Sequence, residues 1–507
     1  MRKAIGLLLA GLAVAAGLSC GGGSAPAGAP VAVPAEKHPP VVMIMFDEFS
    51  TASLVDSHHR IDPVRYPNFA RLAREATWFP NATSSLDDTG PAIRSLLSSR
   101  VTWRSARDSF PYRSRNLFTV MARSYRLDVS EEVSSLCPKR LCPGARQLTG
   151  HDVRHRLATG RPQRFDRWVR SIGRSARPTF YYKHALLPHA PWRYLPSGRQ
   201  FRDGRTQKRY SWNLLHYTRW LVNQSYQRHL LQVGFTDRLL GRALARLRAT
   251  GLYDRALVVV TADNGESFGR LGNGHEISNK NAGDIALTPL LIKLPGQRGG
   301  RIVRRHVRTL DLLPTIARVA HVRIPWRAHG RPVFGPGASR IPVTTVMYKR
   351  SGRRIRLSPR SLARRADAAL RLKLGLFGSG NDPPGLFGIG PRPSLHGTPV
   401  SRLTVLPAGR TRAALDAASR YRRVRRSSGS VPARVMGELT GRGSRRQVDL
   451  AVAVNGTVVA TAPTFAPRRG ATQLFSVLVP ERSFREGRNG VKLYAIGAGM
   501  RLRQLTP

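Results

Sequence analysis

Short apolar runs alternate with helical patterns through the first 340 residues of the chain. VVMIMF at 41–46 and ALVVVT at 256–261 are almost uninterrupted, which is typical of strands buried on both faces of a parallel sheet. TFYYKHALL at 179–187 and TPLLIKL at 288–294 predict two more buried strands. The alternation predicts an α/β fold in which helices sandwich a mostly parallel sheet.

The clearest helix directly precedes the strand at 256–261. Apolar residues recur there at every fourth position, at Leu231, Phe235, Leu239, Ala243 and Leu247. Gly251 follows, where a C-terminal helix cap is expected. A helix that leads into a buried strand belongs to a parallel sheet, and such sheets carry functional residues at the carboxyl ends of their strands.

The pattern changes after about residue 340. Residues 341–428 are basic and partly helical, and they include the Gly- and Pro-rich stretch GSGNDPPGLFGIGPRP. In residues 429–507, DLAVAVNGTVVATA alternates around Asn455-Gly456, which is a strong hairpin signal. LFSVLVPE and GVKLYAIG supply further strands. We therefore predict a small C-terminal antiparallel unit that resembles a β-sandwich.

The N-terminus has the pattern of an export signal. Residues 1–20 have a basic start, an apolar run and then small residues, and residues 21–38 form a Gly-, Ala- and Pro-rich tether. Cys20 follows Gly-Leu-Ser, which resembles a lipoprotein cleavage box and predicts lipidation; cleavage after Ala27 is the alternative. We expect an exported protein that is either anchored to a membrane through its N-terminus or secreted.

Export bears on the two remaining cysteines, which stand in CPKRLC. An oxidising compartment favours a Cys137–Cys142 disulfide. A zinc site at this place would need two further ligands nearby, and the flanking sequence offers none. A structural disulfide is therefore the favoured interpretation.

The chain is strongly basic, with a net charge of +55 from 84 basic and 29 acidic residues. Arginine supplies most of the basic residues, which is consistent with codon bias as well as with a surface that attracts polyanions. The arginines are spread along the chain without interleaved aromatic residues, so a specific nucleic-acid partner is not expected.

Acidic residues are scarce, yet they occur where two of the predicted strands end. Asp47-Glu48 follows the first strand, and Asp263-Asn264 follows the strand at 256–261. Thr89 stands before Gly-Pro at a turn into an apolar helix. Each feature alone is common in caps and turns. Together they supply hard oxygen ligands for a divalent metal, with calcium, magnesium or manganese favoured and zinc as the alternative.

A metal would explain the position of Thr89. Coordination lowers the pKa of a bound oxygen by several units, so the hydroxyl could attack phosphorus or sulfur. The leaving oxygen needs a proton, and the developing negative charge needs cations. Candidates for these roles are His189, His275, Lys183 and Lys280.

Several motifs follow one another in an order that resembles the sulfatase branch of the alkaline phosphatase superfamily. The resemblance covers roughly residues 40–330 and rests on VVMIMFDE, YPNFARLAREATWFPNATSS, TGPAIRSLLSSR, LPHAPW, VVVTADNGES, GH, TPLLIKLPG and TLDLLPTIARV. It implies an alkaline-phosphatase/sulfatase-like catalytic domain, which we expect in residues 39–340. In sulfatases a Cys-x-Pro-x-Arg motif stands eleven residues before a helix arginine, and counting back from Arg100 reaches Thr89.

The resemblance assigns roles to individual residues. It implies metal ligands at Asp47, Glu48, Thr89, Asp263 and Asn264, and catalytic roles for Thr89, His189, His275 and Lys280. It also implies substrate binding by Arg94 and Lys293, and Lys183 is a further substrate-binding candidate because of its charge alone. Lys280 and Lys293 are alternative candidates for one family lysine, and Arg94 stands one place beyond the motif arginine.

Two departures shape the functional prediction. Threonine cannot become the formylglycine of sulfatases, and the family's Gly-Lys-x-His motif is missing from ARSYRLDVSEE. We therefore expect a metal-dependent hydrolase or transferase for anionic esters, with phosphate favoured over sulfate and envelope polymers or lipids as substrates. The alternative is a catalytically lapsed relative that binds anionic envelope polymers.

Overall fold

A computed structural model describes most of the chain. The described residues are 37–101, 110–144, 147–201, 218–269, 274–335, 338, 344–347 and 354–506. The expected signal peptide with Cys20, and all but the last two residues of the expected tether, lie outside them. Within the described part of the chain, no helix combines the length and apolarity needed to cross a bilayer.

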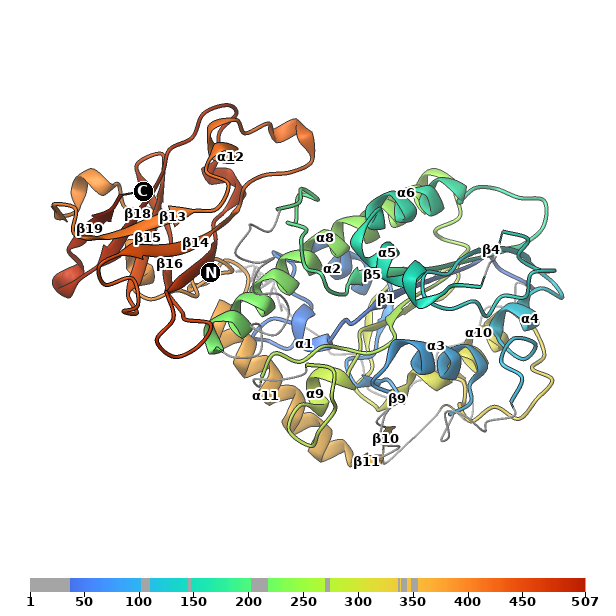
Figure 1. Ribbon diagram of the computed structural model, residues 1–507. Coiled ribbons are helices and arrows are strands. Elements are labelled where there is room, and N and C mark those ends of the chain that lie inside the picture. The colour runs from blue at the N-terminus through green and yellow to red at the C-terminus, as the bar shows by residue number, and fades with distance from the viewer. Residues whose placement is uncertain are drawn as a thin grey trace, which may run out of the picture.

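A seven-stranded sheet forms the centre of the larger part of the molecule (Figure 1). Its strand order is β4 (Arg126–Ser130), β5 (Thr179–Pro188), β1 (Val41–Asp47), β6 (Leu257–Ala262), β7 (Leu290–Lys293), β2 (Thr77–Trp78) and β8 (Arg301–Ile302). The first four are parallel, whereas β7 runs antiparallel to both β6 and β2. The expected α/β fold with a mostly parallel sheet is confirmed.

Helices cover both faces of this sheet (Figure 1). One face packs against α2 (Pro67–Ala73), α6 (Arg161–Ser171) and α8 (Arg219–Ala249), and the other against α3 (Thr89–Ser98), α4 (Leu117–Met121) and α10 (Leu312–Val319). Side chains of β1 alternate between the two cores: Ile44 enters the first, and Met43 and Met45 enter the second. Because both faces are covered, the strand is apolar at every position before its acidic end.

Shorter elements complete this part. They are α1 (Thr51–Leu54), α5 (Gly150–Ala158), α9 (Ala282–Ile285), the long α11 (Pro359–Phe377), the paired short strands β3 (Ala82–Thr83) and β9 (Val307–Arg308), and the hairpin of β10 (Thr344–Met347) and β11 (Arg354–Leu357). Helix α11 packs against α9 and α1, so it lies close to the loops that follow β1 and β6.

A separate β-unit follows, in two small sheets. One has the order β12 (Val405–Leu406), β19 (Leu502–Leu505), β18 (Val491–Ile496), β15 (Asp449–Val454) and β16 (Thr457–Pro463); the other is β13 (Thr411–Leu415), β14 (Arg434–Gly441) and β17 (Leu474–Leu478). All pairs are antiparallel except β12 with β19. The predicted hairpin at Asn455-Gly456 joins β15 to β16, with both turn residues at positive φ. Strands β12 and β13 lie before residue 429, so these sheets begin earlier in the chain than the expected boundary.

The β-unit is held at the start of α8. Trp220 Nε1 and Gln224 Nε2 both donate to the main-chain oxygen of Ser476 on β17, at 3.2 and 2.6 Å. Leu221 and Leu231 of the same helix share an apolar cluster with residues of β14 and β17. Figure 1 shows α8 running from the central sheet toward the β-unit.

Candidate active site

Two acidic strand ends meet at one edge of the central sheet. Strands β1 and β6 are parallel neighbours, so Asp47 and Asp263 come to the same edge. Asp47 points to the face that α3 covers, and Thr89 is the first residue of that helix. Thr89 Oγ1 donates a hydrogen bond to Asp47 Oδ1 at 3.2 Å. The structure therefore brings the predicted nucleophile to the predicted metal ligands.

Main-chain hydrogen bonds fix the two loops at this edge. Asp263 Oδ1 accepts from the amide of Asn264 at 2.7 Å and from the amide of Glu48 at 3.2 Å. Glu48 has φ of 57°, a left-handed conformation that costs free energy for a residue with a side chain. Asp47 forms one group with His184 and Asp263, and Glu48 forms another with Glu266 and His275; a third group, of Asp47, Glu48 and His189, joins the two.

The first group of side chains, around Asp47 and Asp263, contains oxygen atoms that accept no hydrogen bond from any described residue. Asp47 Oδ2, Asp263 Oδ2 and Asn264 Oδ1 are buried and accept no hydrogen bond among the described residues. Leaving such atoms unpaired is costly, and a divalent cation would satisfy all three. Burial raises the pKa of Asp47 to about 7, and burial with the nearby Asp47 raises the pKa of Asp263 well above its usual range. This oxygen-rich set fits the divalent metal that the sequence predicts.

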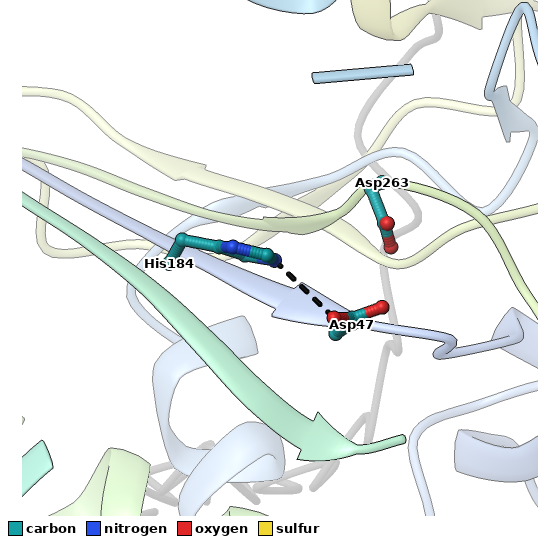
Figure 2. A group of neighbouring side chains, drawn as sticks. All are labelled: Asp47, His184 and Asp263. Carbon is teal, nitrogen blue, oxygen red and sulfur yellow. Dashed lines mark ion pairs between the residues drawn. The ribbon is translucent and has the colours of Figure 1, made fainter. Parts of the chain in front are cut away.

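His184 is a site residue that sequence reasoning missed. It projects from β5 toward the first group, with Nε2 3.6 Å from Asp47 Oδ2 (Figure 2). Burial, with the nearby Lys183, lowers the pKa of His184 to about 3, so the ring is neutral and can donate a nitrogen lone pair. With Asp47 and Asp263 it meets the spacing of a metal-binding group. The available signal was the pair Lys183-His184 in a strand that is otherwise mostly apolar and aromatic.

The second group surrounds Glu48. Its Oε1 lies 2.8 Å from His189 Nε2 and 3.1 Å from His275 Nε2, and His275 Nε2 is also 3.1 Å from Glu266 Oε2. Although burial opposes the charged ring, the carboxylates of Glu48 and Asp47 raise the pKa of His189 to about 10. Burial raises the pKa of Glu266 to about 8. The structure thus gives His189 a proton at neutral pH and adds Glu266, which the sequence analysis did not select.

Lys183 does not belong to the site. Adjacent residues of a strand point to opposite faces, so Lys183 points away from the face that His184 enters. Lys183 Nζ forms an ion pair with Glu132 Oε1 at 2.5 Å and donates to Ser130 Oγ at 3.0 Å. The predicted substrate-binding role is therefore wrong for this residue, because a buried carboxylate already holds its charge.

Lys293 is also displaced from the site. Strand β7 runs antiparallel to β6, so Lys293 at its carboxyl end pairs with Val258 near the start of β6, at the edge opposite Asp263. Its Nζ donates to the main-chain oxygens of Asp254 and Leu294, both at 3.2 Å. The prediction that Lys293 binds substrate, which came from the family resemblance, is therefore wrong.

The other predicted residues lie on the turns around Thr89 and His275. A Cβ added at Gly90 would stand 4.0 Å from Arg94 Nη1, so this guanidinium lies close to the turn that carries Thr89. Lys280 is exposed in the turn that precedes α9. Asp87 Oδ2 accepts from the amide of Ile277 at 3.4 Å, which links the segment after His275 to the turn before Thr89.

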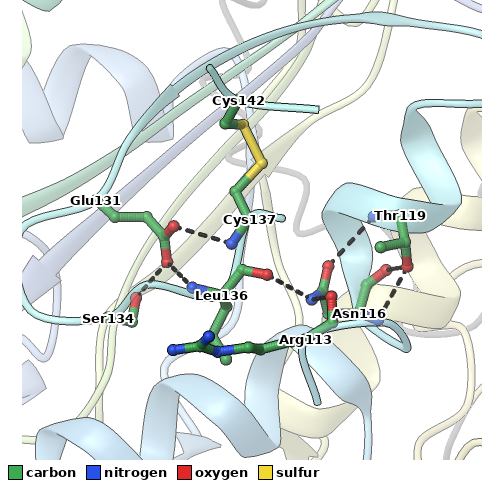
Figure 3. The surroundings of a disulfide bond; sticks show 8 residues. All are labelled: Arg113, Asn116, Thr119, Glu131, Ser134, Leu136, Cys137 and Cys142. Atoms are coloured by element: carbon green, nitrogen blue, oxygen red, sulfur yellow. Dashed lines mark hydrogen bonds between the residues drawn. A yellow bond between two sulfur atoms is a disulfide. The ribbon is translucent and has the colours of Figure 1, made fainter. Parts of the chain in front are cut away.

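The two cysteines form a disulfide beside α4 (Figure 3). The carboxylate of Glu131 accepts from the amides of Leu136 and Cys137 at 2.9 and 3.0 Å. Asn116, the N-cap of α4, donates from Nδ2 to the oxygen of Leu136 at 2.9 Å. These bonds attach the CPKRLC loop, closed by Cys137–Cys142, to the helix.

Residues 163–322 match a protein-family model described as Sulfatase. This stretch of the chain is therefore similar to the Sulfatase family. The matched segment includes His184, His189, Asp263, Glu266 and His275, so it supplies much of both groups. Strand β1 and helix α3 precede that segment, and the fold brings their side chains to the same edge of the sheet.

Three individual proteins are similar to this chain at low identity or over a short stretch. A protein described as "Ulvan-active sulfatase" from Formosa agariphila is 31% identical over 93 residues, which are 18% of this chain and 18% of that protein. A phosphonate monoester hydrolase from Silicibacter pomeroyi is 20% identical, with 61% of this chain and 79% of that chain covered and a TM-score of 0.44. The corresponding hydrolase of Agrobacterium radiobacter is 18% identical, with 62% and 82% covered and a TM-score of 0.44.

Proposed function

We propose that this sulfatase-like chain is a metal-dependent hydrolase or transferase of phosphate or sulfate esters that works through Thr89. The observation that carries the proposal is the hydrogen bond from Thr89 Oγ1 to Asp47 Oδ1, beside three buried oxygen atoms that lack partners. A structural turn needs no such unpaired oxygens, since burying them without a cation is costly.

The cation would be held by Asp47, Asp263, Asn264 and Thr89, with His184 beside them. When bound, it supplies positive charge that stabilises the developing negative charge and favours the ionised hydroxyl. Asp47 Oδ1 orients Thr89 Oγ1 through their hydrogen bond and can accept its proton. Asp47 would therefore both orient Thr89 and help to hold the cation.

The reaction then proceeds in two displacements. Thr89 Oγ forms a bond to phosphorus or sulfur, and the bond from that atom to the leaving oxygen breaks. Protonated His189 gives its proton to the leaving oxygen. In the second step His189 takes a proton from water or an acceptor hydroxyl, whose oxygen displaces Thr89, and Asp47 returns the proton to Thr89. Water as acceptor gives hydrolysis, and an alcohol gives transfer.

Phosphate is the favoured ester, because threonine cannot supply the hydrate oxygen of a formylglycine. Sulfate esters are the alternative class, supported by the family match and by a relative described as a sulfatase. We further propose that the protein is exported and acts on anionic polymers or lipids of the cell envelope. The N-terminal signal pattern and the net charge of +55 support this setting.

The test is turnover of aryl phosphate, phosphodiester and sulfate esters by the full chain with calcium, magnesium, manganese or zinc. Thr89→Ala should lower metal-dependent turnover of the preferred ester at least a thousandfold, as removal of other nucleophiles does. Ser98→Ala is the matched control, because it removes a hydroxyl from the same helix that only binds the Arg94 carbonyl. Turnover that survives Thr89→Ala would refute the assignment.

A second candidate function is binding without catalysis. Two of the three predicted lysines point away from the site, and the family's Lys-x-His pair is missing, which favours a lapsed enzyme. Such a protein would bind a non-hydrolysable ester analogue in the presence of metal. It would turn over none of the three ester classes with any of the four metals.

A further inference from the structure

A small cavity lined by arginine side chains lies in the β-unit, apart from the candidate active site. It has a volume of 230 Å³ and is lined among others by Arg420, Arg423, Arg425, Arg434 and a single acid, Asp416. Four arginines and one aspartate give the lining a net charge of +3. We call it the arginine pocket.

Most of this positive charge is not neutralised by the protein. Within the described part of the chain, Arg420, Arg423 and Arg425 form no ion pair with an acidic side chain. Arg434 is buried and donates from Nε to Ser476 Oγ at 3.2 Å. The positive charges of arginines that line one cavity repel one another, so an anion bound there would lower the electrostatic energy.

The framework around the arginine pocket is well packed. Tyr421 is buried, and its ring stacks on Phe484 with centroids 6.1 Å apart. Val424 exchanges main-chain hydrogen bonds with Gly487, at 2.9 and 2.8 Å. The arginines that follow Tyr421 are thus presented from a fixed backbone, and less entropy is lost when they bind a ligand.

The pocket also adjoins the sulfatase-like part of the molecule. Gln200 donates from its amide to the oxygen of Gly429 and accepts from the amide of Val431, both at 2.9 Å. Arg199 Nε donates to the oxygen of Arg426 at 2.8 Å. Residues 199–200 end the segment that leaves the active site at His189, so one continuous piece of chain connects the two sites.

We propose that the arginine pocket binds a sulfate or phosphate monoester on a sugar of a polyanionic glycan, while the active site processes another ester of the same polymer. This inference rests on the proposed function and names its substrate class. Guanidinium groups bind such oxyanions through paired hydrogen bonds. The cavity is smaller than the roughly 300–1,000 Å³ of sites for drug-sized ligands, so it fits one small charged group.

The lining favours a glycan over a nucleic acid. Single-stranded nucleic acids bind by stacking bases on exposed aromatic side chains. Tyr421 is the aromatic residue of this lining, and its ring is buried against Phe484. Ser428 and Ser430 line the cavity as well, and the Ser428 hydroxyl lies 3.3 Å from that of Ser430, so the lining is polar and suits a sugar.

The test is binding of fluorescently labelled sulfated dextran and phosphorylated dextran to the full chain, with neutral dextran as the blank. Arg423→Ala with Arg425→Ala should weaken binding of the charged dextrans about tenfold. The matched control is Arg468→Ala with Arg469→Ala, two exposed arginines of the same β-unit outside the pocket, which should change binding less than twofold. The dextran whose binding is weakened more by the Arg423→Ala and Arg425→Ala substitutions carries the ester that the pocket prefers.

A variant with two lysines in place of the arginines distinguishes the effect of positive charge from that of guanidinium geometry. Arg423→Lys with Arg425→Lys keeps the charge but loses the paired hydrogen bonds, so binding should weaken by several-fold. Equal losses from the pocket and control pairs would overturn the proposal, as would pocket-dependent binding of a single-stranded oligonucleotide but of neither dextran. Turnover of small aryl esters, measured on the same variants, should not change. If no ester is turned over at all, the proposed catalysis fails while the binding result still decides the pocket.

Discussion

His184 places a neutral imidazole beside the carboxylates of the first group, which makes it a candidate nitrogen ligand for the proposed cation. His184→Gln should therefore weaken binding of manganese by about ten- to hundredfold, a typical loss for a residue next to a metal site. Titration calorimetry on the full chain measures this.

His229→Gln is the matched control for that experiment. Burial also lowers the pKa of His229 to about 3, so it too is a neutral, buried histidine. His229 lies on α8, and its Nε2 instead lies 3.2 Å from Oγ of Ser53 on α1. Metal binding should be nearly unchanged in His229→Gln, and equal affinities for the two variants would show that His184 is not a ligand.

The buried ion pair of Lys183 and Glu132 should lose different amounts of stability depending on which partner is replaced. Glu132→Gln leaves the Lys183 ammonium buried without its carboxylate, which should cost about 3–5 kcal/mol of unfolding free energy. Lys183→Met should cost less, because Arg164 Nε still contacts Glu132 Oε2 at 2.5 Å and compensates its charge. Urea denaturation of both variants checks the order, which reverses if Arg164 does not share the carboxylate.

The residue scale also shows where sequence reasoning stopped. The motifs located Thr89, Asp47, Asp263 and His189 correctly at one edge of the sheet. The run TFYYKHALL predicts a buried strand, but a strand buried on both faces has no polar side that would distinguish its faces. The sequence therefore could not show that His184, rather than Lys183, points toward the site.

At the level of elements, the turn after β6 depends on close contact between main chains. A Cβ added at Gly265 would stand 2.0 Å from the carbonyl oxygen of Asp284 in α9. Gly265→Ala must therefore move the loop that carries Asp263 and Asn264, and we expect a loss of several kcal/mol and of metal binding. In Gly269→Ala the nearest atom is Leu372 Cδ2 at 3.6 Å, so this control should be nearly neutral. Thermal unfolding with and without manganese compares them.

Helix α11 carries a buried lysine that makes stability depend on pH. Burial, reinforced by Arg65, lowers the pKa of Lys373 to about 7, and its Nζ donates to the oxygen of Val55. The unfolded chain holds this proton up to a pH of about 10.4, so between pH 7 and 10 unfolding takes up a proton. Stability from this group therefore rises with pH, by up to about 1.4 kcal/mol per unit.

Urea denaturation at pH 7, 8 and 9 tests the contribution of Lys373. Lys373→Met should remove that part of the slope, whereas Lys492→Met, at an exposed position of β18, should keep it. An unchanged slope in Lys373→Met would mean that the buried lysine keeps its proton in the folded state.

The direction of β7 shows what apolar patterns leave open at this scale. An apolar run indicates burial but has no direction. Parallel neighbours need a long crossover, usually a helix, whereas antiparallel ones do not. Between β6 and β7 the longest described helix is α9, with four residues, and this shortness was the signal that Lys293 would lie at the far edge.

For the whole molecule, the family match and the fold explain different parts of the site. The matched residues 163–322 contain the second strand end and both histidines of the second group. The first strand end and Thr89 join them only through the parallel pairing of β1 with β5 and β6 and the packing of α3. Sequence order could predict that meeting because parallel strands end at one edge, whereas the docking of the β-unit on α8 had no motif to predict it.

That docking predicts how the molecule unfolds. Trp220 and Gln224 bind Ser476, and apolar residues of α8 share one cluster with the β-unit, so neither part can lose its structure without exposing the other. Calorimetry of the full chain should therefore show one thermal transition. Trp220→Ala, at the junction, and Trp326→Ala, whose Nε1 donates to the Ser98 oxygen within the sulfatase-like part, should both lower that single Tm. Two transitions, with each variant shifting a different one, would show that the β-unit folds independently.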